Sequence, residues 1–363
     1  MHGIRLISAA MSRLDKLMNA AKRLIAGTLG LEDPICIMPY RGYGTPDNLH
    51  LRGRVLQDQG IKLREENASV WRNLRNMYRR FESDEVAEAR VRAYFGAAQQ
   101  DVLTNAEGFF QVTFALSDQP VESDRFWQPI TLELLEPLPR HSAPIKVDSE
   151  VMVVSERARF GVISDIDDTI MRTAATDLLK MIRIAYLGNE NTRRPFSGVA
   201  EFYHALQQGQ NDDHRNPIFY VSSSAWNMYD LFEKFMDFNH IPRGPILLRD
   251  IELSPANLLS FKHESHKIEQ ITPILNCFSH LPFILIGDSG QKDPEIYQQL
   301  VKHHPDRIFA IYIRDVTPND SQRQGELEAI ANQVKETGCE FVVFPETQVA
   351  MEHAITHHWI SCN

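Results

Sequence analysis

The sequence predicts an α/β protein: a parallel sheet with helices on both faces, preceded by a β-sandwich-like domain and an N-terminal amphipathic helix. Two observations support this fold class. From residue 156 to 363, short apolar runs without alternation are separated by segments of helical periodicity, which is typical of parallel strands buried on both faces. Residues 32–155 instead carry short, mostly alternating runs at regular spacing, which is typical of a sandwich.

The first 31 residues have the 3–4 spacing of an amphipathic helix, with Leu14 and Leu24 on the apolar face and Lys16 and Arg23 on the other. Five basic residues against one acidic residue give this segment a net charge of 5 − 1 = +4. Basic amphipathic helices bind anionic membrane surfaces. Contact with such a surface is therefore one interpretation, and packing against the rest of the chain is the other.

In the β-rich domain, five runs have the pattern of strands. They cover residues 49–56, 89–95, 109–114, 130–134 and 151–154. A helix is expected near residues 68–81, with four arginines along roughly one side. That side is either a solvated helix face or a contact for phosphates or an acidic partner.

From residue 156 onward, strands and helices alternate. Six buried strands are predicted at 161–164, 217–221, 245–248, 283–286, 308–313 and 340–344. Helices are predicted at about 175–187, 198–207, 226–238, 266–278 and 294–302. In an open parallel sheet of this kind, binding sites lie at the carboxyl ends of the strands.

Composition excludes several classes of protein. The 38 basic and 48 acidic residues give a net charge of −10, which argues against a general nucleic-acid binder. No apolar run is long enough for a membrane-spanning helix, and the N-terminus lacks the apolar core of a secretory signal. The four cysteines are scattered, as expected for free thiols in a reducing compartment. We therefore expect a cytoplasmic protein, with peripheral membrane contact through the N-terminal helix as an option.

Polar residues follow the predicted strands where each strand ends. Asp165, Asp167 and Thr169 come after the first strand, and Ser222-Ser223-Ser224 after the second. Lys267 opens the helix that precedes the fourth strand, which ends at Asp288 with Asp293 shortly beyond. Because the carboxyl ends of parallel strands meet at one edge, we expect these residues to converge.

Clustered carboxylates without cysteine or neighbouring histidine favour a hard cation, and Mg²⁺ is the usual one beside phosphate. Asp165 can attack phosphorus to form an aspartyl-phosphate. Asp167, two residues on, can protonate the leaving alkoxide and afterwards activate water. The Ser222 hydroxyl and the Lys267 ammonium can hold the oxygens of the transferring phosphoryl group.

These four elements, in this order, resemble the four motifs of the haloacid dehalogenase superfamily of phosphotransferases, which implies a Rossmann-like sheet. The resemblance implies Asp165 as nucleophile, Asp167 as acid/base, and Ser222 and Lys267 as the second and third motifs. For the cofactor we expect Mg²⁺, held by Asp165, Asp167, Asp288 and Asp293. As further substrate contacts we expect Thr169, Ser223 and Arg249.

A narrower resemblance covers nearly the whole chain. Its segments are Pro39–Thr45, Gly53–Leu56, Ser164–Arg172, Tyr220–Asn227, His266-Lys267 and Gly287–Gly290. Together they resemble the actin-patch phosphatidate phosphatase family, which pairs a β-rich domain with a Mg²⁺-dependent phosphatase domain. The resemblance implies conversion of phosphatidate to diacylglycerol. The fungal members' long C-terminal tail for actin-associated partners has no counterpart before Asn363, so we do not expect an actin role.

Other interpretations stay open at this point. The same mechanism would serve a soluble phosphomonoester or a phosphoprotein, and a non-catalytic adaptor is a third reading that Asp167 argues against. Lys262 competes with Lys267 for the third motif, and the start of a helix favours Lys267. Arg249 and Arg314 follow strands of the same sheet and bind either a second substrate anion or a structural partner. His353 and His357 have the i, i+4 spacing of metal ligands, but no acidic residue is spaced to complete a zinc site, so we expect a solvated C-terminal helix there.

Overall fold

The computed structural model describes residues 35–57, 85–116, 121, 125–138, 144–171, 195–210, 215–249 and 263–362, without the side chains of 263–265. The expected helices at 1–31, near 68–81 and at 175–187 lie outside these residues. Among the described helices, none combines the length and apolar character needed to cross a bilayer.

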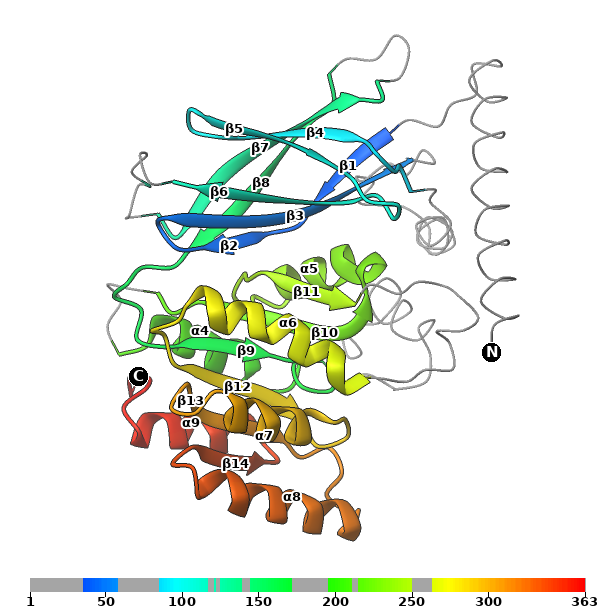
Figure 1. Cartoon of the computed structure of the whole chain (residues 1–363). Helices are drawn as coiled ribbons and strands as arrows, with labels where there is room; N and C mark the ends of the chain where they lie inside the picture. The colour runs from blue at the N-terminus through cyan, green and yellow to red at the C-terminus, as the bar shows by residue number, and fades with distance from the viewer. Residues whose placement is uncertain are drawn as a thin grey trace, which may run out of the picture.

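The β-rich part is one mixed sheet of eight strands (Figure 1). Its strands are β1 (Ile35–Pro39), β2 (Gly42–Gly44), β3 (Asn48–Gln57), β4 (Arg90–Phe95), β5 (Ala98–Leu103), β6 (Phe109–Ala115), β7 (Trp127–Glu136) and β8 (Lys146–Val153). The order is β1-β3-β2-β8-β7-β4-β5, with β6 paired to β3, and only the β2–β8 pair is parallel. The sheet curls until β5 and β6 contact each other, which encloses an apolar core.

The alternating sequence pattern places that core. Along β3, buried and half-exposed residues alternate, so Leu49, Leu51 and Val55 point inward. They pack with Val112 of β6 and Leu132 of β7. The five strand predictions fall on β3, β4, β6, β7 and β8, whereas β1, β2 and β5 were not predicted.

The second sheet has six strands, all parallel, in the order β11-β10-β9-β12-β13-β14. They are β9 (Gly161–Ser164), β10 (Ile218–Ala225), β11 (Ile246–Arg249), β12 (Phe283–Asp288), β13 (Ile308–Arg314) and β14 (Glu340–Phe344). β9 and β12 are buried at every position, because both faces of the sheet are covered. The six strand predictions are confirmed.

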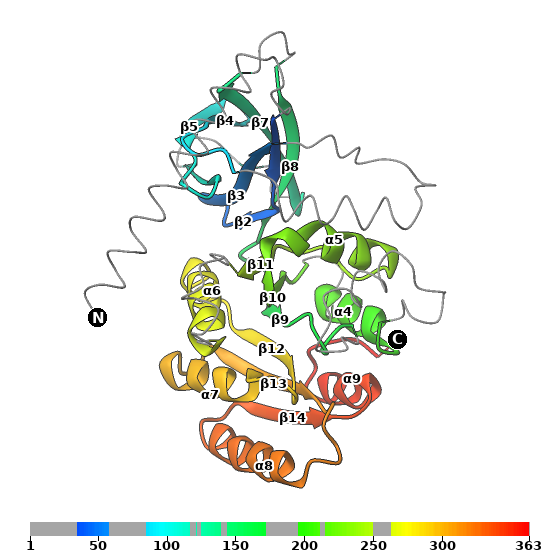
Figure 2. The ribbon, with the colours of Figure 1, turned by 90° about the vertical axis from the view of Figure 1, so that its right-hand side faces the viewer.

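Helices cover both faces of the parallel sheet (Figure 2). The described ones are α4 (Val199–Gln208), the 3₁₀ turn η1 (Trp226–Met228), α5 (Tyr229–Phe238), α6 (His263–Cys277), α7 (Asp293–His303), α8 (Ser321–Lys335) and α9 (Thr347–Thr356). One apolar core lies under α4, α5 and α9, and another lies under α6, α7 and α8. α8 was not predicted, since Leu327, Ile330 and Val334 are its only buried apolar positions.

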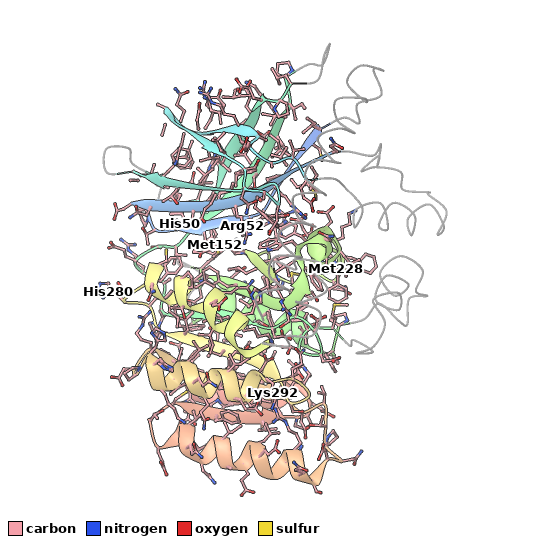
Figure 3. All side chains as sticks on the ribbon, turned by 45° about the vertical axis from the view of Figure 1, so that its right-hand side comes forward. His50, Arg52, Met152, Met228, His280 and Lys292 are labelled. Atoms are coloured by element: carbon pink, nitrogen blue, oxygen red, sulfur yellow. The ribbon has the colours of Figure 1, made fainter. Side chains whose placement is uncertain are left out.

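The mixed sheet lies over the β11 edge of the parallel sheet and over α5 (Figure 1). The ring of Tyr40 lies 4.3 Å from that of Trp226, and Arg41 forms an ion pair with Glu233 at 3.0 Å. Arg52, on the side of β3 that faces the parallel sheet, stacks 4.9 Å from the Trp226 ring (Figure 3). Covering an edge strand prevents it from pairing with another chain.

Candidate active site

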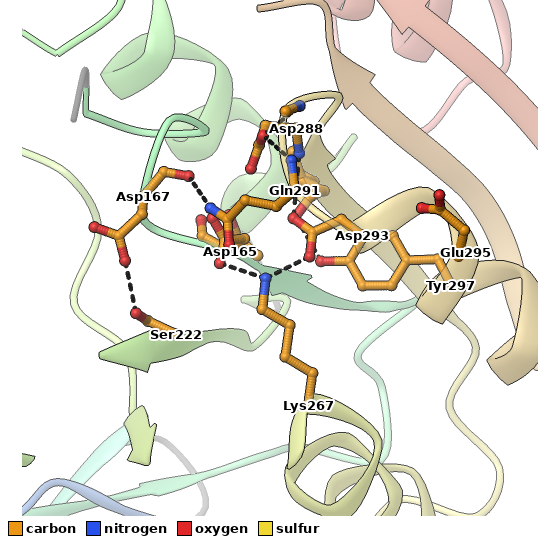
Figure 4. Close-up of polar contacts among 12 residues, drawn as sticks. Asp165, Asp167, Ser222, Lys267, Asp288, Gln291, Asp293, Glu295 and Tyr297 are labelled. Carbon is orange, nitrogen blue, oxygen red and sulfur yellow. Dashed lines mark hydrogen bonds and ion pairs between the residues drawn. The ribbon is translucent and has the colours of Figure 1, made fainter. Parts of the chain in front are cut away.

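Three neighbouring strands bring the expected site residues together (Figure 4). Asp165 follows β9 directly, Asp288 ends β12, and Ser222 lies in β10. Lys267 enters from the first turns of α6, and Asp293 is the first residue of α7. Because β9 lies between β10 and β12, the carboxyl ends of all three strands meet at this point.

Lys267 is the buried cation of the site, with 2% of its surface exposed. Its Nζ donates to Asp165 Oδ1 at 2.7 Å and also to Asp293 Oδ1. Asp293 Oδ2 accepts the backbone N–H of Asp288 at 3.2 Å. This approach requires Gly287, where a Cβ would lie 2.5 Å from Asp293 Oδ2. Both carboxylate oxygens of Asp293 therefore accept hydrogen bonds that connect α7 to α6 and β12.

Two carboxylate oxygens in the site, Asp165 Oδ2 and Asp288 Oδ2, are buried and have no hydrogen-bond partner among the described residues. The other oxygen of Asp288 is satisfied, since Oδ1 accepts the backbone N–H groups of Gly290 at 2.7 Å and Gln291 at 2.9 Å. One oxygen each from Asp165, Asp288 and Asp293 lie within 4.8 Å of one another. Buried anions without partners are costly, so this donor set fits a hard divalent cation.

The electrostatics of the site agree with that fit. Burial raises the pKa of Asp165 well above its usual value, against the opposing effect of Lys267. Burial and the charge of Asp293 raise the pKa of Asp288 to about 7. Although burial lowers the pKa of Lys267, the charges of Asp165 and Asp293 outweigh it and raise that pKa overall. One ammonium thus faces three buried carboxyl groups, and a dication would neutralise the excess negative charge.

The carboxylate of Asp167 lies apart from these three. Its Oδ2 accepts hydrogen bonds from Ser222 Oγ at 2.8 Å and from Ser224 Oγ at 3.2 Å. The backbone oxygen of Asp167 accepts from Gln291 Nε2 at 3.1 Å (Figure 4). Asp167 is thus oriented by β10 and by the loop after β12. Sequence reasoning assigned no role to Ser224 or Gln291, although both stand within the strand-end runs.

Arg314 fixes the loop after β9 from the side of β13. It is 3% exposed, and its Nε donates to the backbone oxygen of Thr169 at 2.9 Å. Its Nη2 donates to Thr347 Oγ1 at 3.0 Å, and its guanidinium lies 4.0 Å from the ring of Phe196. Of the two sequence readings of Arg314, the structure supports the structural one.

The remaining expected residues are Thr169, Ser223, Arg249 and Lys262. Thr169 is buried and its Oγ1 has no hydrogen-bond partner in the described part of the chain, whereas Ser223 is half-buried in β10. Arg249 is the last residue of β11, the edge strand two positions from β9. Lys262 lies outside the described residues.

The fold and this site define a class: an α/β protein with a buried, lysine-containing carboxylate centre at the strand ends. Residues 160–315 match the family model described as the catalytic domain of phosphatidate phosphatase APP1. Phosphatidate phosphatase APP1 of Saccharomyces cerevisiae is 31% identical over 229 residues, covering 62% of this chain and 38% of the yeast protein. Residues 160–315 of this chain therefore resemble the catalytic domain of APP1-type phosphatidate phosphatases.

Two further comparisons are more distant. An uncharacterized protein of Schizosaccharomyces pombe is 25% identical over 253 residues, covering 69% of this chain and 40% of that protein. The chain thus spans about two fifths of the length of the curated relatives it matches. A carbohydrate acetylesterase from Xanthomonas citri aligns over 87% of this chain and 73% of its own, at 11% identity, with a TM-score of 0.30. That score is too low to carry a statement about fold.

Proposed function

We propose that this chain is a Mg²⁺-dependent phosphatase of the haloacid dehalogenase type, with Asp165 as nucleophile, and that it hydrolyses phosphatidate to diacylglycerol and phosphate. The resemblance to APP1-type phosphatidate phosphatases supports the activity and the substrate. The observation that carries the chemistry is the pair of partnerless buried oxygens, Asp165 Oδ2 and Asp288 Oδ2, beside the buried Lys267. We place the catalytic unit at residues 156–363.

Asp165 and Asp288 would hold the Mg²⁺, because each has a buried oxygen that no group among the described residues satisfies. Of the four expected ligands, Asp293 serves the site through Lys267, and the Asp167 carboxylate is held by serines. Bound there, Mg²⁺ would offset the charge of the carboxylates and polarise the phosphoryl oxygens.

Two steps of phosphoryl transfer follow from the side chains. A carboxylate oxygen of Asp165 forms a bond to phosphorus while the phosphate ester bond breaks, and protonated Asp167 gives its proton to the departing diacylglycerol oxygen. In the second step, Asp167 takes a proton from a water that attacks phosphorus. The bond between Asp165 and phosphorus then breaks, releasing inorganic phosphate.

The surrounding residues keep these two carboxylates in place. Ser222 and Ser224 hold the Asp167 side chain, and Gln291 holds its backbone. Lys267 orients one oxygen of Asp165 and leaves the other free. Such preorganised positioning and charge neutralisation provide most of the catalysis in phosphoryl transfer.

The test is phosphate release from phosphatidate in mixed micelles, with Mg²⁺ and with EDTA. We expect turnover only with Mg²⁺, loss of turnover in Asp165→Asn, and unchanged turnover in Asp148→Asn, which alters an exposed carboxylate of β8. Turnover of soluble phosphomonoesters with no release from phosphatidate would reject the lipid substrate. Full activity of Asp165→Asn would reject the covalent mechanism.

A cytoplasmic location with peripheral membrane contact is part of this proposal. The helix expected to make that contact, over residues 1–31, has a net charge of +4 and lies outside the described residues. A substrate held in a bilayer would be reached most readily by an enzyme that binds the bilayer surface.

A further inference from the structure

A second group of metal-binding side chains lies away from the strand ends, between α9 and β14. His353 in α9 and His357 just after its end stand one helical turn apart, and Glu340 opens β14. One ligand atom from each of these three residues lies within 4.8 Å of the other two. Figure 2 shows α9 beside β14, and the two elements contact each other. The third ligand that the sequence spacing lacks is therefore provided by a neighbouring strand.

The orientation of His353 suits a metal ligand. Its Nδ1 is hydrogen-bonded to the Tyr312 hydroxyl at 3.0 Å, and this contact turns Nε2 toward Glu340, whose Oε2 lies 3.8 Å away. A metal-bound histidine usually has its second ring nitrogen held by such a partner, which fixes the ring. Tyr312 is itself buried in β13. The ring of His353 is thus anchored before any ion arrives.

The remaining two ligands are accessible and adjustable. His357 is exposed, and its ring stacks 4.2 Å from that of His353. The side chain of Glu340 is 40% exposed. Four-coordinate zinc with ligands about 2.0–2.2 Å from the ion holds its donor atoms about 3.3 Å apart. The donor atoms now lie within 4.8 Å of one another, so ion binding requires them to move closer, and Glu340 and His357 are the more exposed of the three side chains.

We propose that Glu340, His353 and His357 form a Zn²⁺ site that links α9 to β14. The ion is assigned from the ligands, because two imidazoles and one carboxylate suit Zn²⁺ far better than Mg²⁺, which prefers oxygen ligands. Three protein ligands leave the fourth position of a tetrahedral ion to water. The site does not depend on the proposed phosphatase chemistry, since it shares no residue with the carboxylate centre.

The test is Zn²⁺ titration of the full chain by isothermal calorimetry, after removal of metal with a chelator. His357→Gln and Glu340→Gln each delete one ligand from a different element, and His358→Asn is the matched control. His358 is exposed and adjacent but outside the cluster, and asparagine tolerates its positive φ of 57°. Comparison between variants cancels any Zn²⁺ bound by the carboxylate centre.

We expect the unaltered chain and His358→Asn to bind one equivalent more than the two ligand variants, or to bind it at least tenfold more tightly. Zn²⁺ should raise the melting temperature of the unaltered chain and of His358→Asn but not that of the ligand variants. In the unaltered chain it should also shift the ring signals of His353 and His357 in nitrogen-detected NMR. A cooperative melting transition in chelator shows whether each variant folds. If only one of the two ligand variants folds, that variant is sufficient for the comparison. Equal stoichiometry and affinity in all four proteins would overturn the proposal.

Discussion

The buried carboxylate of Asp288 should destabilise the metal-free protein, and Asp288→Asn should therefore stabilise it. The pKa of Asp288 is raised from 3.8 to about 7. This penalty on the ionised form is absent below about pH 4 and fully present above about pH 7, where it amounts to about 4 kcal/mol at 1.36 kcal/mol per pKa unit. Asparagine keeps an oxygen to accept the N–H groups of Gly290 and Gln291 and removes the charge.

Allowing for local relaxation, we expect Asp288→Asn to gain about 2–4 kcal/mol at pH 8 in EDTA, or about 5–10 °C in melting temperature. Mg²⁺ should raise the melting temperature of the unaltered protein and have little effect on the variant, because a ligand stabilises the state that binds it. The assay is thermal unfolding by circular dichroism, with Asp148→Asn as the control. The reasoning would be refuted if Asp288→Asn melted at a lower temperature than the unaltered protein in EDTA and Mg²⁺ did not change the melting temperature of the unaltered protein.

Further predictions concern the site and its surroundings. Because Mg²⁺ competes with a proton on Asp288, the apparent Kd for Mg²⁺ should rise up to about tenfold per pH unit below pH 7. An apparent Kd that stays constant in calorimetry from about pH 5.5 to 8 would count against Asp288 as a ligand. Ser222→Ala removes the 2.8 Å hydrogen bond to Asp167 and should lower kcat about tenfold at unchanged fold; an unaltered kcat would show that Ser224 suffices. Arg314→Gln should cost about 2 kcal/mol in urea unfolding and also lower kcat, whereas full activity would mean that the Thr169 loop holds without it. Deletion of residues 1–30 should weaken sedimentation with anionic liposomes in a salt-dependent way, and unchanged sedimentation would reject the membrane contact.

Much of the parallel sheet could be predicted from the sequence, because strands buried on both faces must be apolar at every position. Phe283–Ile286 and Ile308–Ile313 are such apolar runs, and both are strands, although Phe309 is exposed. The same argument missed β5, whose residues alternate between half-buried and exposed positions and include no fully buried one. Strands of that kind owe their pairing to their neighbours and carry little hydrophobic pattern of their own.

The residues of the carboxylate centre were also predictable, since Asp165 and Asp288 stand directly at strand ends and Ser222 follows the apolar run of β10. Which contacts each of these carboxylates makes could not be predicted. Only the folded chain places Asp293 on Lys267 and the Asp167 carboxylate on two serines, which leaves Asp165 and Asp288 with the free oxygens. These are contacts across 26 and 55 residues of sequence, and spacing carries no information about which oxygen a side chain presents.

The sequence by itself determined the fold class of the C-terminal half and the chemical character of its strand-end edge, because both follow from local patterns of apolar and charged residues. Tertiary structure decided which groups meet. The register of β13 and β14 pairs Ala310 with Glu340, and α9 then lies so that His353 and His357 face that glutamate. A helical spacing of four residues shows two ligands of such a site; the third comes from a strand, and only long-range packing can bring it there.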